Sequence, residues 1–188
     1  MKRPWGFVLI LLLAMPTWAQ QAYHGDGPDD VLRIVPAATA IALKACGMES
    51  KSCWKRLAVN AAMSYALAAG TTWTLKHAIH ERRPDYTDNH AFPSGHTAMA
   101  FAGAVVLDKE YRHVSPWISA AGYAVATGVA VDRVVRNRHH WQDVTAGAAI
   151  GAGSTLLGYW LGGKLTGQHS RYHITASAST LALTIKLD

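Results

Sequence analysis

Three short stretches of this 188-residue chain carry side chains that together could bind and cleave a phosphoryl group. The cationic members of the set are Lys76, Arg83 and Arg133. The members able to transfer protons or attack phosphorus are His96, His139 and Asp143. Between them lie a hydroxyl group and an unobstructed backbone N–H, those of Ser94 and Gly95. Because fixed cations neutralise phosphate charge and histidine can act as nucleophile or acid, the set predicts phosphoryl chemistry that needs no metal.

The spacing of these residues predicts how they are positioned. Lys76 and Arg83 are seven residues apart, which is two helical turns, so one helix face could present both before Pro84 ends the helix. Ser94 precedes the apolar stretch Thr97 to Leu107 and is suited to cap a helix there, where the free N–H groups favour an anion.

His139 and Asp143 are separated by four residues. On a helix this spacing places the carboxylate beside the imidazole, where it would fix the tautomer of the ring and stabilise the imidazolium. Each of these residues taken alone is common in a structural role. Their joint occurrence favours a catalytic role.

The order and spacing of the three stretches resemble a known family. Lys76 with six residues before Arg83-Pro84, then Pro93-Ser94-Gly95-His96, then Arg133, His139 and Asp143 is similar to the signature of the type 2 phosphatidic acid phosphatases. That family is related to bacterial acid phosphatases and vanadium haloperoxidases. One position departs from its pattern: Asp132 stands where the family usually has serine. An acid beside an anion site is unfavourable unless it points away or pairs with a neighbouring arginine.

The resemblance implies a role for each matched residue. His139 would attack phosphorus to give a phosphohistidine, and Asp143 would orient it. His96 would protonate the leaving oxygen and then activate water. The remaining matched positions would stabilise the phosphoryl oxygens: Lys76, Arg83, Ser94, Gly95 and Arg133. No metal or other cofactor is implied.

Other polar residues near these stretches receive weaker interpretations. His140 is a poorer candidate for the nucleophile, because only His139 has the family spacing to both Arg133 and Asp143. His77 and His80 resemble a metal-binding pair only loosely, since no cysteine or carboxylate completes a site. Three more arginines are expected to raise the positive potential at the rim: Arg82, Arg136 and Arg138.

The N-terminus predicts export. Lys2 and Arg3 precede an apolar run from Trp5 to Met15, which is short for a membrane span, and small residues follow. We therefore expect residues 1–19 to be a signal peptide and 20–188 to be one phosphatase domain in the periplasm or the envelope membrane. For an exported chain we also expect a disulfide between Cys46 and Cys53.

The remainder of the chain predicts an all-α fold, a compact bundle of about five to six helices with a short C-terminal strand. Five apolar segments carry the helical prediction: 31–45, 57–75, 97–107, 117–131 and 144–161. The tail, 171–187, contains the alternating stretch Leu181 to Ile185, which is typical of a strand whose partner the sequence leaves open.

Composition leaves two locations open and limits the partners. Segments 57–75 and 144–161 are long enough to cross a bilayer, whereas the mean hydropathy of +0.05 favours a compact exported domain. Trp54, Trp73 and Trp117 are candidates for anchors at a lipid interface. The net charge of +6 suits a membrane surface or a phosphorylated substrate, either a lipid or a small phosphate, and no nucleic-acid motif is present.

Three functions fit these observations. The first is a phosphatase acting on a phosphomonoester or pyrophosphate, expected to be that of an envelope lipid. The second is a vanadate-dependent haloperoxidase, which would hold vanadate at the same residues, although the resembling haloperoxidases are much larger. The third is a non-catalytic phosphate-binding envelope protein, which the complete set of catalytic positions disfavours.

Overall fold

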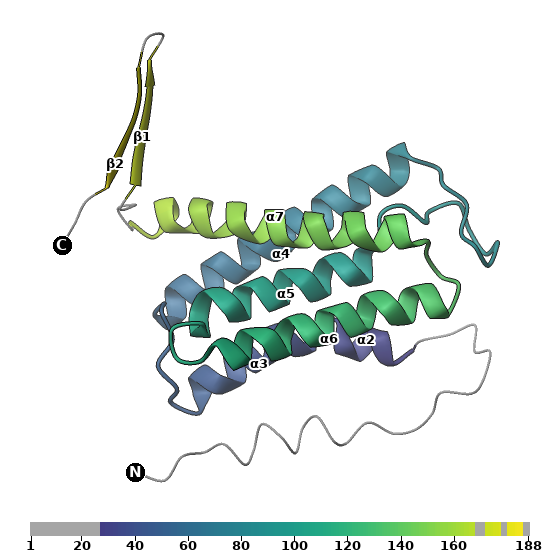
Figure 1. Cartoon of the computed structure of the whole chain (residues 1–188), viewed down its shortest axis with the longest axis horizontal. Helices are drawn as coiled ribbons and strands as arrows, with labels where there is room; N and C mark the ends of the chain where they lie inside the picture. Colours follow the sequence, from purple (N-terminus) through teal and green to yellow (C-terminus); the bar gives the residue numbers. More distant parts are fainter. Residues whose placement is uncertain (1–26, 168–171, 178–179, 186–188) are drawn as a thin grey trace.

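The computed structural model describes residues 27–167, 172–177 and 180–185, and there the chain forms a helical bundle and one hairpin (Figure 1). The helices are α2 (Pro28–Leu32), α3 (Val35–Ala45), α4 (Trp54–Ala78), α5 (Gly95–Tyr111), α6 (Pro116–Val135) and α7 (Trp141–Leu165). The strands are β1 (Tyr172–Ser177) and β2 (Thr180–Ile185). The predicted all-α bundle is confirmed. The predicted signal peptide lies outside the described residues.

Local sequence signals explain where the long helices begin. The hydroxyl of Ser94 accepts from the Thr97 N–H at the start of α5, as predicted. Ser115 caps α6 in the same way, with Pro116 in the first turn, where its missing N–H has no cost. The Asp143 carboxylate accepts the His140 N–H at 2.9 Å and so caps α7. Two of these capping residues also belong to the predicted site.

The first apolar segment, 31–45, is divided into two helices rather than one. α2 ends at Leu32, and α3 starts at Val35 with Pro36 in its first turn. A proline inside a continuous helix would remove one hydrogen bond and clash with the preceding turn, so a new helix begins here instead. The break leaves α2 as a separate short element that packs against α6 and α5.

α5 is the central helix, because it packs against α3, α4, α6 and α7 (Figure 1). Glycines on α7 allow its backbone to approach the neighbouring helices closely. A Cβ atom at Gly147 would lie 2.5 Å from the Ser94 carbonyl oxygen, and one at Gly158 would lie 2.5 Å from the Ser64 hydroxyl. Small residues thus permit close packing of the helices.

The loop between α3 and α4 corrects the disulfide prediction. Cys46 and Cys53 are both exposed free thiols, so the structure does not support a bond between them. Hydrogen bonds hold this loop instead. The buried Glu110 carboxylate accepts the Ser52 N–H at 2.8 Å, and the Glu110 carbonyl accepts the Lys51 N–H at 3.2 Å.

The C-terminal tail has more strand structure than the sequence predicted. β1 and β2 pair antiparallel, with Tyr172 opposite Ile185 and Ser177 opposite Thr180. The predicted strand around Leu181 to Ile185 is therefore confirmed, and its partner is the segment immediately before it in the chain.

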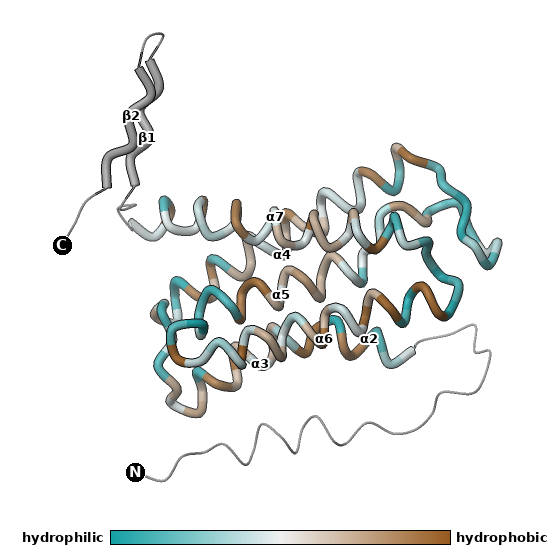
Figure 2. Tube along the Cα trace, in the orientation of Figure 1, coloured by the Kyte–Doolittle hydropathy of each residue, from teal (hydrophilic) through white to brown (hydrophobic). Residues whose placement is uncertain are grey.

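The distribution of hydropathy along the bundle bears on whether the protein could cross a membrane. Hydrophilic residues concentrate in the loops at the two ends, and apolar residues are frequent along the helices between them (Figure 2). Among the described residues, α6 alone is long and apolar enough to cross a membrane by length and composition. One such helix is weak evidence, because core helices of other proteins meet the same criterion.

Candidate active site

The predicted site residues meet at one end of the bundle, where α4 and α6 end and α5 and α7 begin. The Ser94 N–H donates to the Asp143 carbonyl at 3.0 Å, which joins the starts of α5 and α7. A Cβ atom at Gly95 would lie 3.9 Å from Cε of Lys76, which places the end of α4 beside them. Residues from distant parts of the sequence thus share one small volume.

His139 and Asp143 form the contact that their spacing predicted. Nδ1 of His139 lies 3.3 Å from Oδ2 of Asp143, and both side chains are buried. His139 precedes α7 rather than lying on it, so the helical reading of the spacing is wrong for this residue. The pair still forms, because the His139 backbone N–H is held by the Arg133 carbonyl at 3.2 Å. With Nδ1 facing Asp143, the other ring nitrogen, Nε2, is available for chemistry.

The surroundings of His139 keep its ring neutral. Burial is the largest effect and, together with the charges of Arg133, Arg83, Lys76 and His96, lowers the pKa of His139 to about 2. The ring therefore carries an unshared electron pair at any physiological pH. The cations of the first and third stretches therefore all act on this one imidazole, as does His96 of the second.

Lys76 and Arg83 reach the site from different elements, which corrects the prediction of a shared helix face. α4 ends at Ala78 because Ile79 adopts an extended conformation. Arg83 lies in the following loop, where its Nε donates to Asp88 at 2.7 Å. Nζ of Lys76 donates to the His90 carbonyl in the same loop at 2.7 Å. Burial, and next the charge of Arg83, lowers the pKa of Lys76 to about 8.

Two guanidinium groups at the site keep buried donors without a partner among the described residues, as does Nε of Arg56 at the far end of α4. The two donors at the site are Nη1 of Arg83 and Nε of Arg133. Arg133 is only 6% exposed. A buried N–H without a partner is costly, so such atoms indicate that a ligand completes the site. An anion with several oxygens would satisfy both.

Ser94 and Gly95 occupy the start of α5, as predicted. Ser94 is fully buried, and its hydroxyl lies 3.0 Å from that of Thr97. The first N–H groups of a helix have no partner within the helix and attract anions. Because Gly95 has no side chain, its backbone N–H at the start of α5 is not covered on the side that faces Lys76.

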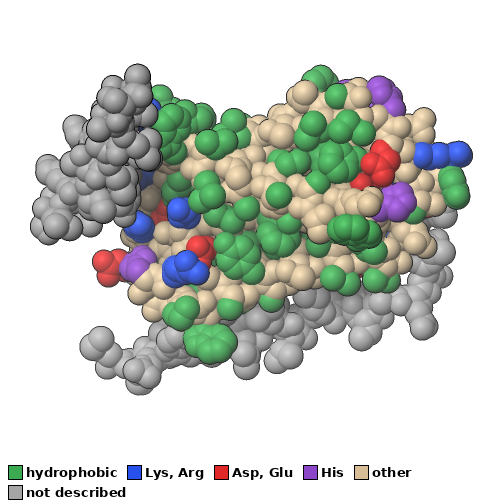
Figure 3. Space-filling view, turned by 45° about the horizontal axis from the view of Figure 1, so that its top comes forward, with side chains coloured by type: hydrophobic (Ala, Val, Ile, Leu, Met, Phe, Trp, Pro, Cys, Tyr) green, Lys and Arg blue, Asp and Glu red, His purple; other side chains and the backbone are tan. Residues whose placement is uncertain are grey.

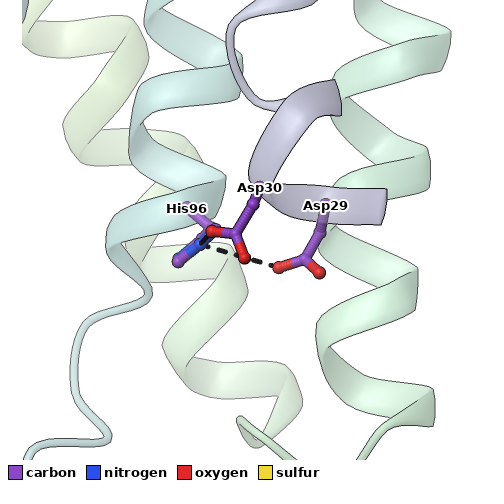
Figure 4. Close-up of side chains that lie close together, drawn as sticks. All are labelled: Asp29, Asp30 and His96. Atoms are coloured by element: carbon purple, nitrogen blue, oxygen red, sulfur yellow. Dashed lines mark hydrogen bonds and ion pairs between the residues drawn. The ribbon is translucent and has the colours of Figure 1, made fainter. Parts of the chain in front are cut away.

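Two functional candidates escaped the sequence reasoning, Asp29 and Asp30 of α2 (Figure 4). Oδ2 of the fully buried Asp29 accepts from Arg133 at 2.5 Å, and its Oδ1 accepts from Arg136 at 2.8 Å. Oδ1 of Asp30 lies 2.6 Å from Nε2 of His96. Pro28 followed by two acids does signal a helix start. Nothing in the sequence links that start to a residue 104 positions away.

Asp132, the residue that departs from the family pattern, pairs with a neighbouring arginine. Its Oδ2 lies 3.7 Å from Nη1 of Arg136, one turn further along the chain. Burial, followed by the nearby charge of Asp29, raises the pKa of Asp132. Asp132 thus lies within ion-pair distance of one of the arginines that were expected at the rim, although its Oδ2 accepts no hydrogen bond among the described residues.

The remaining polar candidates lie around the site. Nη1 of Arg138 donates to Asp85 at 2.8 Å, and Arg82 stacks over the Tyr86 ring at 4.5 Å. His140 is half exposed and lies 3.5 Å from Glu81. His77 and His80, which only loosely resembled a metal-binding pair, stack with other rings: His77 with Trp73, and both with His90.

Two groups of possible metal ligands occur among the described residues. They are Asp29, Asp30 and His96, and Glu81, His140 and Asp143. In the first, both oxygens of Asp29 are already engaged by Arg133 and Arg136, whose charges oppose a metal ion. In the second, Oδ2 of Asp143 is engaged by His139 and by the His140 N–H, whereas its Oδ1 has no partner among the described residues. The arrangement favours an anion over a cation.

Comparison with known proteins identifies a family. The family model described as PAP2 superfamily matches residues 57–166. A lipid A 1-phosphatase of Porphyromonas gingivalis is 40% identical over 134 residues, which are 71% of this chain and 30% of that protein. The chain therefore spans less than a third of the length of this curated relative.

A solved structure shares the fold. The crystal structure of Aquifex aeolicus LpxE superposes with a TM-score of 0.54 at 22% identity, covering 73% of this chain and 89% of that one. The matched region holds all three sequence stretches, and their residues converge at one end of an all-α bundle. The chain belongs to the PAP2 superfamily.

Proposed function

We propose that this protein is a metal-independent phosphatase that hydrolyses a phosphomonoester or pyrophosphate of an envelope lipid through a phosphohistidine intermediate. The observation that carries the proposal is the pair of buried, unpartnered donors, Nη1 of Arg83 and Nε of Arg133, beside the neutral ring of His139. A phosphoryl group would satisfy both donors and place phosphorus next to a nucleophile.

The first step forms a bond between Nε2 of His139 and phosphorus while the bond from phosphorus to the leaving oxygen breaks. Asp143 holds Nδ1 of His139 and stabilises the positive charge that the ring gains on attack. Protonated His96 gives its proton to the leaving oxygen, so the alcohol or phosphate departs uncharged at that atom.

The second step reverses these roles. Neutral His96 takes a proton from water as the water oxygen bonds to phosphorus and the bond to His139 breaks. Phosphate is released, and both histidines return to their starting states. Throughout, the phosphoryl oxygens are stabilised by Lys76, Arg83 and Arg133, together with the start of α5.

A lipid substrate is supported by the relative and by the surface near the site. The matched protein from Porphyromonas gingivalis is a lipid A 1-phosphatase. Trp73, Trp141 and Tyr86, all close in sequence to site residues, are more than half exposed. Tryptophan and tyrosine favour the boundary between lipid and water.

The wider surface also suits contact with lipid. Figure 3 shows hydrophobic side chains spread over one face between charged groups at its ends. Leu156, Leu157 and Trp160 of α7 are among the exposed apolar residues. We propose that the site faces the surface of an envelope membrane, which the protein would reach after the predicted export. Trp54 and Trp117, also candidate anchors, begin α4 and α6 and so lie at the end away from the site.

The test is phosphate release by the purified protein from a substrate panel. The panel contains lipid A with a 1-phosphate, phosphatidic acid, undecaprenyl pyrophosphate and p-nitrophenyl phosphate. At least one lipid should be cleaved, and His139→Ala should abolish turnover. His140→Ala is the matched control, because its side chain is half exposed, and it should retain most activity.

Retention by His139→Ala of more than about a tenth of kcat, a loss under about 1.4 kcal/mol, would refute the nucleophile assignment. Failure to release phosphate from any substrate would refute the function. The haloperoxidase alternative is not favoured, because the matched relative is a phosphatase. Halide oxidation that depends on added vanadate would restore it.

A further inference from the structure

Two charged side chains at α2 reach His96: Asp30 lies in the helix, and Arg33 directly follows its last residue (Figure 4 labels Asp30). Oδ1 of Asp30 lies 2.6 Å from Nε2 of His96, and Nη1 of Arg33 lies 3.0 Å from the same nitrogen. The two side chains are 3.5 Å from each other. One ring nitrogen therefore has an acceptor and a donor within hydrogen-bonding distance.

These two partners suit opposite protonation states of His96. A protonated Nε2 can donate to Asp30, and an unprotonated Nε2 can accept from Arg33. An acid that becomes a base within one reaction cycle must exist in both states. A nitrogen with a partner for each state is not left unsatisfied in either.

We propose that Asp30 and Arg33 are positioning residues that support the acid–base cycle of His96. The inference rests on the proposed function, since it assumes that His96 protonates the leaving oxygen. The proton that moves is the one on Nε2. Before transfer Asp30 holds this N–H, and after transfer the lone pair faces Arg33. Unlike Asp143, which contacts the non-reacting Nδ1 of His139, this pair contacts the nitrogen of His96 that exchanges the proton.

Charged groups on α6 and at α2 act on the pKa of His96, and Asp30 opposes the effects of burial and of the arginines. Burial is the largest effect and lowers the pKa of His96, while the hydrogen bond to Asp30 raises it. The charges of Arg133 on α6 and Arg33 on α2 lower the pKa further, and that of Asp29 raises it. His139, before α7, also interacts with His96. Asp30 thus keeps the protonated form accessible against burial and two arginines.

The test compares Asp30→Asn and Arg33→Gln, which should act in opposite directions. The histidine titrations are followed by NMR, with the His96 resonance assigned by its loss in His96→Ala. Asp30→Asn should lower the His96 titration midpoint, and Arg33→Gln should raise it. Asp108→Asn is the matched control, because Asp108 pairs with Arg112 at the far end of the same helix as His96. It should leave the midpoint unchanged.

Kinetics supply a second readout. With an alkyl phosphate near neutral pH, Asp30→Asn should lower kcat by about tenfold, part of the roughly 10²–10⁴-fold that a positioned acid contributes. With p-nitrophenyl phosphate, whose leaving group needs no proton, the loss should be much smaller. A purely structural role would lower both rates equally and would move no titration.

Three results would overturn the proposal. The first is a His96 midpoint that neither variant moves, and the second is a midpoint that both move in one direction. The third is a higher kcat/KM in Asp30→Asn, which would mean that Asp30 occupies the place of the substrate. If Asp30→Asn does not fold, Arg33→Gln alone still tests the direction in which the His96 titration midpoint shifts. If the wild type releases no phosphate, the proposed function fails, whereas the titrations still test the pairing.

Discussion

Gly147 sits where α7 meets the start of α5, so adding one methyl group there should disturb catalysis more than stability. A Cβ atom at this position would lie 2.5 Å from the Ser94 carbonyl oxygen and 3.3 Å from Cβ of Thr97. Contacts under 3.0 Å essentially never occur for real Cβ atoms. Restoring an ordinary contact requires α7 to move from α5 by about 1 Å.

That movement acts directly on the site. The Ser94 N–H to Asp143 carbonyl bond, 3.0 Å long, joins the two helix starts and would stretch. Asp143 and the His139 that it orients would shift relative to the phosphate-binding end of α5. A displacement of about 1 Å can cost about 100-fold in rate. Overpacking itself should cost about 1–3 kcal/mol of stability.

Two other glycines of α7 are matched controls for Gly147→Ala. Gly158→Ala produces a similar conflict, 2.7 Å from Cα of Ser64, but far from the site. Gly153→Ala points into open space and should stabilise the helix by up to about 1 kcal/mol. We would measure unfolding by denaturant and kcat for all three. If Gly147→Ala kept kcat within about threefold of Gly158→Ala at similar stability, the proposed coupling between packing and catalysis would be refuted.

Three further outcomes are expected. Because three cations already neutralise the phosphoryl charge, activity should survive EDTA and vanadate should inhibit competitively; loss with EDTA that a divalent metal restores would contradict this. His96→Ala should lose far less rate with p-nitrophenyl phosphate than with an alkyl phosphate, whereas His139→Ala should lose activity on both equally; the reverse pattern would exchange their roles. Since the pKa of Lys76 is lowered to about 8 and the residue loses its charge above that value, KM should rise as pH passes 8. Lys76→Met should have a higher KM than the wild type below pH 8 and no such inflection; an inflection that persists in Lys76→Met would assign it to another group.

The sequence predicted the parts of the site that depend on local spacing. Ser94 caps α5, and His139 contacts Asp143, because each relation spans only a few residues. The all-α fold followed from long apolar segments, whose ends differ from the observed helices by a few residues. Burial of apolar side chains determines both the pattern of apolar residues in the sequence and the packing of the helices, so the predicted and observed helices agree.

The parts that could not be predicted depend on tertiary contacts. The sequence pattern is compatible both with a helix that continues to Arg83 and with one that ends at Ala78. The second occurs, and Arg83 lies in a loop where it contacts Asp88, a contact that forms only in the folded chain. The predicted export favoured a disulfide between the two cysteines, but Glu110 and the loop backbone hold that turn instead. Asp29 was overlooked because its partner, Arg133, is 104 residues away.

The contact between Asp29 and Arg133 has a consequence for where the working unit of this protein begins. A fragment starting at α4 would contain all three sequence stretches and every long helix of the bundle except α3. It would nevertheless leave the buried guanidinium of Arg133 without its carboxylate, a change that costs about 3–5 kcal/mol in buried ion pairs. Added phosphate would restore part of the missing negative charge. The stability of such a fragment should therefore depend on phosphate concentration, and the smallest self-sufficient unit must include the five residues of α2.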